Sequence, residues 1–116
     1  MKVEQEAVRQ TIQIRTKALN TRDLTLYFSV ISSTYHDEKG RDFSRIREDL
    51  SAGFITYDSV LYQPDEQTLR VHGKWAELKG TYRMKLVIHG RQVLLDGKER
   101  MVLMKEAGGW KITSGL

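Results

Sequence analysis

The feature that most constrains this chain is the order of its two hydrophobic patterns. Residues 3–57 place apolar side chains three or four positions apart, which is the period of an amphipathic helix. From Asp58 onward apolar and polar residues alternate, and glycine-containing turns separate the runs, which is typical of antiparallel strands. Helices followed by hairpins predict an α+β domain whose helices pack on one sheet.

The length and composition exclude several classes of protein. At 116 residues the chain has room for a single domain, residues 1–116, with one buried core. Cysteine is absent, which excludes disulfides, a thiolate nucleophile and cysteine-ligated zinc. No run approaches the roughly 18 apolar residues of a membrane span, and residues 1–10 carry charges where a signal peptide is apolar. We expect a soluble protein, cytoplasmic by default, with no membrane partner.

The charge pattern bears on the choice of partner. The chain carries 19 Lys and Arg against 15 Asp and Glu, a formal net charge of +4. These basic residues are dispersed along the sequence and mostly interleaved with acidic ones, as on a solvated surface. We therefore expect no nucleic-acid partner.

Three helices are predicted in the first half. The first covers residues 3–20, and the second follows the capping residues 20–23 and extends to Ile31. A turn over residues 35–41 interrupts the pattern. The third helix is predicted to begin at a Ser44 cap, and its apolar residues repeat every four positions.

The second half is predicted to form strands. A strand begins at Asp58 and ends near Gln63, where Pro64, the only proline, closes it. A meander of four long strands then covers 67–72, 75–88, 92–105 and 110–114, joined by glycine-containing turns. The Asp96-Gly97 step within the third of these predicts a bulge that bends the sheet.

Some strand segments are apolar on both faces, notably residues 86–88, 93–95 and 101–104. A sheet with one solvent-exposed face would instead show a polar residue at every second position of its strands. Since the helices can cover only one side, we expect a homodimer formed through the convex face of the sheet. A neighbouring domain that covers the same face is the alternative.

The order of the elements and two short motifs carry a family resemblance. The turn 35–41 after the second helix and the ending Gly-Gly-Trp-Lys-Ile at 108–112 resemble the nuclear transport factor 2-like superfamily, also called SnoaL-like or cystatin-like α+β cone. Segment 71–77 is similar to the hairpin that precedes the long strands in this family. The resemblance implies three N-terminal helices packed on a strongly bent antiparallel sheet, a cystatin-like cone roll with an apolar pocket, usually in a sheet-to-sheet dimer.

The resemblance leaves three functions open, because a fold alone does not choose among them. The first is a domain that binds a small apolar or weakly acidic ligand in the cone. The second is an isomerase, dehydratase or cyclase that uses a pocket aspartate as base and a tyrosine as hydrogen-bond donor. The third is a non-catalytic module for dimerisation or protein association.

Four residues are predicted to form the polar lining of the pocket: Tyr35, Asp37, Tyr57 and Arg100. Asp37 is the candidate catalytic base, which requires a dry pocket that raises its pKa. Strand parity places Arg83 on the convex face and leaves Arg100 facing either the pocket or the dimer seam. No histidines stand at metal-ligand spacing and no cofactor motif is present, so we expect neither a metal nor a cofactor.

Overall fold

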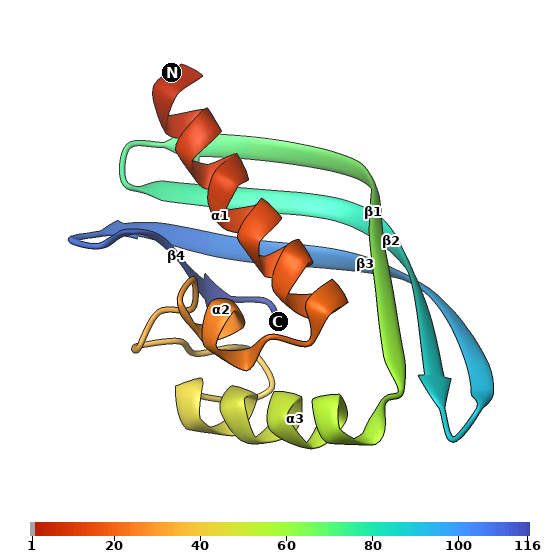
Figure 1. Cartoon of the computed structure of the whole chain (residues 1–116). Helices are drawn as coiled ribbons and strands as arrows, with labels where there is room; N and C mark the ends of the chain where they lie inside the picture. Colours follow the sequence, from red (N-terminus) through yellow and green to blue (C-terminus); the bar gives the residue numbers. More distant parts are fainter. Residues whose placement is uncertain (1) are drawn as a thin grey trace.

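Three helices precede a four-stranded antiparallel sheet in the computed structural model, which describes residues 2–116. The elements are α1 (Lys2–Thr21), α2 (Leu24–Phe28), α3 (Phe43–Thr56), β1 (Ser59–His72), β2 (Trp75–Ile88), β3 (Arg91–Glu106) and β4 (Gly109–Ser114), and the strand order is β1-β2-β3-β4. Helix α1 crosses the upper part of the sheet and α3 lies below it, where the strands bend over (Figure 1). The α+β prediction, three helices packed on a bent antiparallel sheet, is confirmed.

The core lies between α1 and the concave face of the sheet. Helix α1 contributes Val8, Ile12 and Leu19, and the middle of the sheet contributes Met101 and Leu103, all of them buried. Because strand residues alternate between faces, the pairing of Leu78 with Met101 and of Ala76 with Leu103 places one apolar set against the helix. The alternation of apolar residues along the strands therefore determines which face of the sheet packs against α1.

An aspartate caps the N-terminus of α3. The Asp42 side chain accepts a hydrogen bond of 2.9 Å from the backbone N–H of Arg45. The predicted Ser44 cap was wrong, because Asp42 supplies the acceptor two residues earlier and Ser44 lies within the helix.

Helix α2 is shorter than the sequence indicates. It ends at Phe28, and the chain then leaves the helix so that Ile31 forms an isolated parallel bridge with Ile112 of β4. The apolar spacing that extended the predicted helix to Ile31 instead reflects burial, since Ile31 is 4% exposed.

Strand β1 is continuous where two strands were expected. Pro64 does not close it, and the register with β2 shifts between Pro64 and Gln67. Proline is tolerated at this point because β1 is an edge strand, whose outward N–H groups have no ladder partner. The irregularity that bends the sheet is therefore in β1.

The predicted bulge at Asp96-Gly97 was wrong, because both residues pair in regular register with β2. Gly97 has a different role. A Cβ atom at Gly97 would lie 2.5 Å from the Tyr82 hydroxyl oxygen, so only glycine leaves room for that ring. At Gly80, opposite the irregular part of β1, a Cβ atom would lie 2.6 Å from the carbonyl oxygen of Glu66. These two glycines allow close contacts across the bend.

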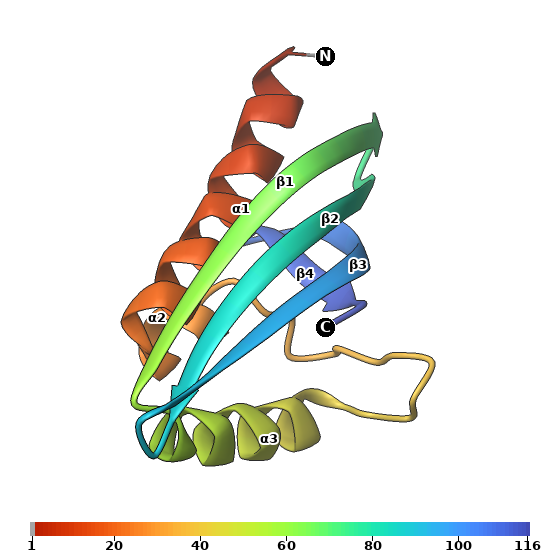
Figure 2. The ribbon, with the colours of Figure 1, turned by 90° about the vertical axis from the view of Figure 1, so that its right-hand side faces the viewer.

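The convex face of the sheet exposes apolar side chains. Leu94 is 73% exposed and Leu61 is 45% exposed. Figure 2 shows α1 along one side of the strands and no helix against the opposite side. The homodimer expected to cover this face stays a prediction. Within residues 2–116 no helix is both long enough and apolar enough to cross a bilayer.

Candidate functional site

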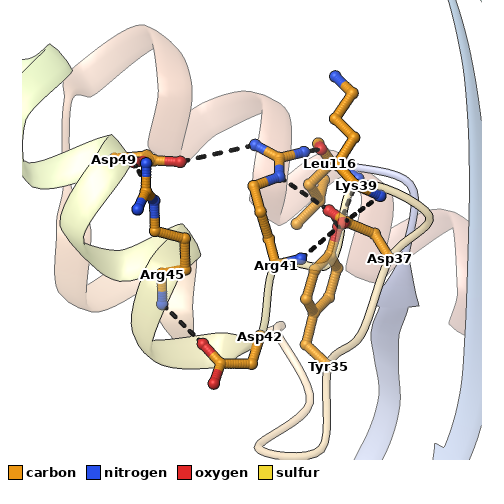
Figure 3. Close-up of polar contacts among 8 residues, drawn as sticks. All are labelled: Tyr35, Asp37, Lys39, Arg41, Asp42, Arg45, Asp49 and Leu116. Carbon is orange, nitrogen blue, oxygen red and sulfur yellow. Dashed lines mark hydrogen bonds and ion pairs between the residues drawn. The ribbon is translucent and has the colours of Figure 1, made fainter.

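The turn between α2 and α3 holds two of the predicted site residues together. The Tyr35 hydroxyl donates a hydrogen bond of 2.9 Å to Oδ2 of Asp37 and accepts one of 2.8 Å from the backbone N–H of Leu116 (Figure 3). Tyr35 is only 1% exposed, and burial raises the pKa of its hydroxyl to about 12. Tyr35 therefore remains a neutral donor over the physiological pH range.

The Asp37 carboxylate accepts four hydrogen bonds. Besides the Tyr35 hydroxyl, the donors are the backbone N–H groups of Lys39 and Arg41, each at 3.0 Å, and Nε of Arg41 at 2.9 Å. Burial alone would raise the pKa of Asp37, but these hydrogen bonds and the Arg41 charge outweigh it, so the pKa is lowered. The contacts favour a structural role for Asp37 over that of a general base.

Arg41 connects the turn to two other parts of the chain. Its guanidinium lies 3.7 Å from Oδ2 of Asp49 on α3 and donates to the carbonyl oxygen of Leu116 (Figure 3). The Arg41 side chain is 22% exposed, so it is held in place but remains accessible.

A cavity of about 210 Å³ opens beside this turn. Its lining consists of Asp37, Glu38, Lys39, Arg41, Arg100, Ser114, Gly115 and Leu116. Arg100 reaches the cavity from β3 while its Nε donates a hydrogen bond of 2.6 Å to Glu77. The lining is mainly charged, with three cations and two carboxylates, and thus differs from the apolar pocket expected from the sequence.

Three of the four predicted residues come together here, since Tyr35 lies directly behind Asp37 and Arg100 lines the same cavity. Tyr57 lies elsewhere, at the C-terminal end of α3, where its ring packs so closely over Gly53 that a Cβ atom there would lie 3.2 Å from it. Arg83 lies on the convex face, as its strand parity indicates, and pairs with the exposed Asp96 at 3.7 Å.

A second polar cluster, which the sequence reasoning missed, lies inside the cone. Arg15 of α1 donates from Nη1 to the Tyr62 hydroxyl at 3.1 Å and to Oε1 of Glu99 at 3.0 Å. The Tyr62 hydroxyl donates to the other carboxylate oxygen of Glu99. The Arg15 and Glu99 side chains are only 10% and 7% exposed. One charge from α1 and one from β3 therefore meet in the core.

Electrostatics keep the Arg15 guanidinium charged. Burial would lower the pKa of Arg15, but the nearby Tyr27, Tyr62 and Glu99 hold it above its ordinary value. Burial also raises the pKa of Tyr62, which keeps that hydroxyl neutral. Nε of Arg15 is buried and has no hydrogen-bond partner among residues 2–116.

One signal in the sequence points to Glu99. It has the same strand parity as Met101 and Leu103, so it lies on the concave face with them. Neither Arg15 nor Tyr62 carries a comparable signal, because an arginine on a helix is usually solvated and an aromatic residue is usually core. Within the described residues 2–116, no group of three acidic or histidine side chains is arranged to hold a metal ion.

Sequence comparison alone does not place the chain: no protein-family model and no curated protein matches it. Solved structures do match. A nuclear transport factor 2-like superfamily protein from Salmonella enterica superposes with a TM-score of 0.85 at 21% identity, over 98% of this chain and 88% of the other. A protein from Streptomyces avermitilis, provisionally named a dehydratase of the nuclear transport factor 2-like family, gives 0.87 at 11% identity, over 99% and 95%.

A third match is a protein from Novosphingobium aromaticivorans, provisionally named an aromatic ring hydroxylase. Its TM-score is 0.88 at 17% identity, over 99% of this chain and 87% of the other. The chain therefore has the nuclear transport factor 2-like fold. At these identities the likeness shows the fold and leaves the function to the site itself.

Proposed function

We infer that the protein binds a small ligand with an acidic group in the cavity beside the turn 35–41. The observation that carries this proposal is the convergence of two arginines from distant parts of the chain, Arg41 and Arg100, on one cavity of about 210 Å³. Lys39 adds a third cation to the lining. A planar guanidinium matches the geometry of a carboxylate, which makes an organic acid the preferred ligand class.

The positions of the arginines support this proposal. Asp37 and Asp49 fix Arg41, and Glu77 fixes Arg100, so neither guanidinium needs to be ordered when a ligand binds. The cavity is smaller than the roughly 300 Å³ at which drug-sized pockets begin. A ligand of about the size of an aromatic carboxylic acid fits this volume.

The names of two structural neighbours agree with a small organic ligand, since they denote a dehydratase and an aromatic ring hydroxylase. The contacts of Asp37 argue against a catalytic role for it. Its carboxylate already accepts four hydrogen bonds and its pKa is lowered, whereas a general base works with a free lone pair and a pKa near the working pH.

A titration followed by nuclear magnetic resonance tests the proposal. Benzoate and its neutral analogue benzamide are added separately to the ¹⁵N-labelled protein. Benzoate is expected to shift the amide signals of residues 37–41 and 114–116, and benzamide is not. Arg100→Gln should weaken benzoate binding by roughly fivefold to tenfold, because a charge-assisted hydrogen bond is lost.

Arg83→Gln is the matched control, because Arg83 is also an arginine of the sheet with one carboxylate partner but does not line the cavity. It should leave benzoate affinity unchanged. Equal shifts with benzamide, or benzoate shifts confined to other parts of the protein, would contradict an acid-binding cavity at this place.

A further inference from the structure

The convex face of the sheet is defined by the pairing of β1, β2 and β3. Residues directly opposite one another share a face, so seven cross-strand rows compose this surface. From the β2–β3 turn toward the β1–β2 turn they are Ser59/Val87/Gln92, Leu61/Lys85/Leu94, Gln63/Arg83/Asp96, Thr81/Lys98, Thr68/Lys79/Arg100, Arg70/Glu77/Val102 and His72/Trp75/Met104. We call these rows the outer face.

The outer face has an excess of positive charge. Its rows contain six cations, Arg70, Lys79, Arg83, Lys85, Lys98 and Arg100, and two carboxylates, Glu77 and Asp96. Two more carboxylates, Asp65 and Glu66 at the irregular part of β1, line a common cavity with Lys98. The six cations therefore exceed the four carboxylates by two.

Three of these six cations form no ion pair within the part of the chain that the structure describes. Arg70, Lys85 and Lys98 are exposed, and none of them forms an ion pair with a carboxylate of the described residues 2–116. Lys79 lies directly opposite Arg100 in the sheet. Like charges at such positions destabilise a sheet, and only the shared contact with Glu77 offsets this pair.

Apolar side chains lie toward both ends of the outer face. At one end Leu61 and Leu94 flank Lys85, and together they line a shallow cavity of about 330 Å³. At the other end Met104 is 38% exposed beside Trp75. Exposed apolar side chains that are rimmed by polar residues can mark a surface that binds another protein.

We propose that the outer face docks an acidic segment of a partner protein, whose carboxylates pair with Lys79, Lys85 and Lys98 while an apolar side chain enters the cavity between Leu61 and Leu94. A second copy of this chain fits less well, because it would bring a face of the same sign against this one. A nucleic acid also fits less well, because the phosphate backbone dominates nucleic-acid affinity and the apolar side chains at both ends of the face would gain little.

The test measures binding to a fluorescein-labelled ten-residue peptide of eight glutamates and two leucines, by fluorescence anisotropy at about 50 mM and 150 mM salt. The outer-face variant is Lys79→Gln/Lys85→Gln/Lys98→Gln. The control variant, Arg9→Gln/Lys17→Gln/Arg47→Gln, removes three exposed cations from α1 and α3. Both variants have the same net charge, and circular dichroism checks that both fold.

The wild type should bind the peptide, with the outer-face variant weakened by roughly tenfold or more and the control variant by less than about threefold. Equal weakening in both variants would overturn the proposal, because only net charge would then matter. Tighter binding of an oligothymidylate of equal charge would assign the face to nucleic acid. If sedimentation shows a stable dimer, and the outer-face variant dimerises more tightly than the wild type, the outer face would be assigned to a second copy. An absence of peptide binding at both salt concentrations would refute the proposal.

Discussion

The two polar clusters of this protein use similar chemistry in opposite surroundings. The cluster of Tyr35, Asp37 and Arg41 lies at the rim of the fold, and all its members come from one turn of seven residues. The cluster of Arg15, Tyr62 and Glu99 lies in the core, and its members come from α1, β1 and β3. Each combines one arginine, one tyrosine and one carboxylate.

The clusters also differ in how completely they are hydrogen-bonded. Every Asp37 oxygen has donors, and Arg41 has carboxylates on both sides. In the core cluster, Nε of Arg15 has no partner among residues 2–116. The rim cluster forms locally and stabilises a turn, whereas the core cluster places charges in a poorly solvated interior and depends on the whole fold. The same interactions should therefore have different energies in the two places.

The largest effect is expected for Glu99→Ala. This change leaves the Arg15 charge buried without its carboxylate, so the free energy of unfolding should fall by about 3–5 kcal/mol. Urea denaturation at neutral pH, with the slope checked against the wild type, measures the loss.

The double variant Arg15→Met/Glu99→Leu sharpens this test, because it removes both charges and restores apolar volume. A buried ion pair is often replaced by well-packed apolar residues without loss of stability, so the double variant should lie within about 1 kcal/mol of the wild type or be more stable. If instead the losses of the single variants Arg15→Met and Glu99→Leu simply add in the double variant, Arg15 and Glu99 do not interact energetically.

The difference between the clusters explains which site residues could be predicted from the sequence. Tyr35 and Asp37 are two residues apart in a turn, so one local pattern places them together. Arg15 and Glu99 are separated by 84 positions, and only the β2–β3 register and the packing of α1 bring them into contact. No local pattern encodes such a distance. Arg100 could not be assigned to a face because the residues around it are apolar on both faces.

The next effect is expected for Asp37→Asn, which should lower the free energy of unfolding by about 2 kcal/mol because the charge-assisted hydrogen bonds in the turn are lost. The lowered pKa of Asp37 fixes the pH dependence of this difference. The carboxylate stabilises the fold above its unfolded pKa, near 3.8, and this contribution is lost as the pH falls through the lower folded value. Denaturation of both proteins between pH 7 and pH 2 should show the difference shrink only in the acid range.

The fold follows from the sequence except where a tertiary contact overrides a local rule. The limits of β2 match the prediction because glycine turns flank it on both sides. Gly97 was interpreted as a bulge, but it is required by the Tyr82 ring packed on it. Pro64 was interpreted as the end of a strand, but an edge position permits it to lie inside β1. For Gly97 the deciding atoms belong to the neighbouring strand β2, and for Pro64 the deciding fact is that no strand pairs with the outer edge of β1.

A smaller effect is expected for Tyr35→Phe, which removes the hydroxyl that joins Asp37 to the Leu116 backbone. The free energy of unfolding should fall by about 1–2 kcal/mol, since one buried N–H loses its acceptor.

Ultraviolet titration provides an independent measurement, because the pKa of Tyr35 is raised to about 12. The wild type should lose stability from pH 10 to pH 12, where the unfolded tyrosine ionises and the folded one does not, and Tyr35→Phe should lose less. If Tyr35 instead ionised near pH 10, the ordinary pKa of a tyrosine, the hydrogen-bonded geometry would be contradicted.

The smallest effect is expected for loss of the ion pair between Arg45 and Asp49, which lies at the exposed edge of the Tyr35, Asp37 and Arg41 cluster. Arg45 and Asp49 form an ion pair of 3.1 Å one turn apart on α3, with side chains that are 63% and 41% exposed. Water and salt screen such pairs, so Arg45→Gln should change the free energy of unfolding by no more than about 0.5 kcal/mol. Adding salt to about 1 M should abolish that difference and leave most of the loss caused by Glu99→Ala, because the core pair is shielded from the solution. If salt instead reduced both differences equally, the Arg15 and Glu99 charges would be hydrated, and the contrast between a solvated rim and a dry core would be wrong.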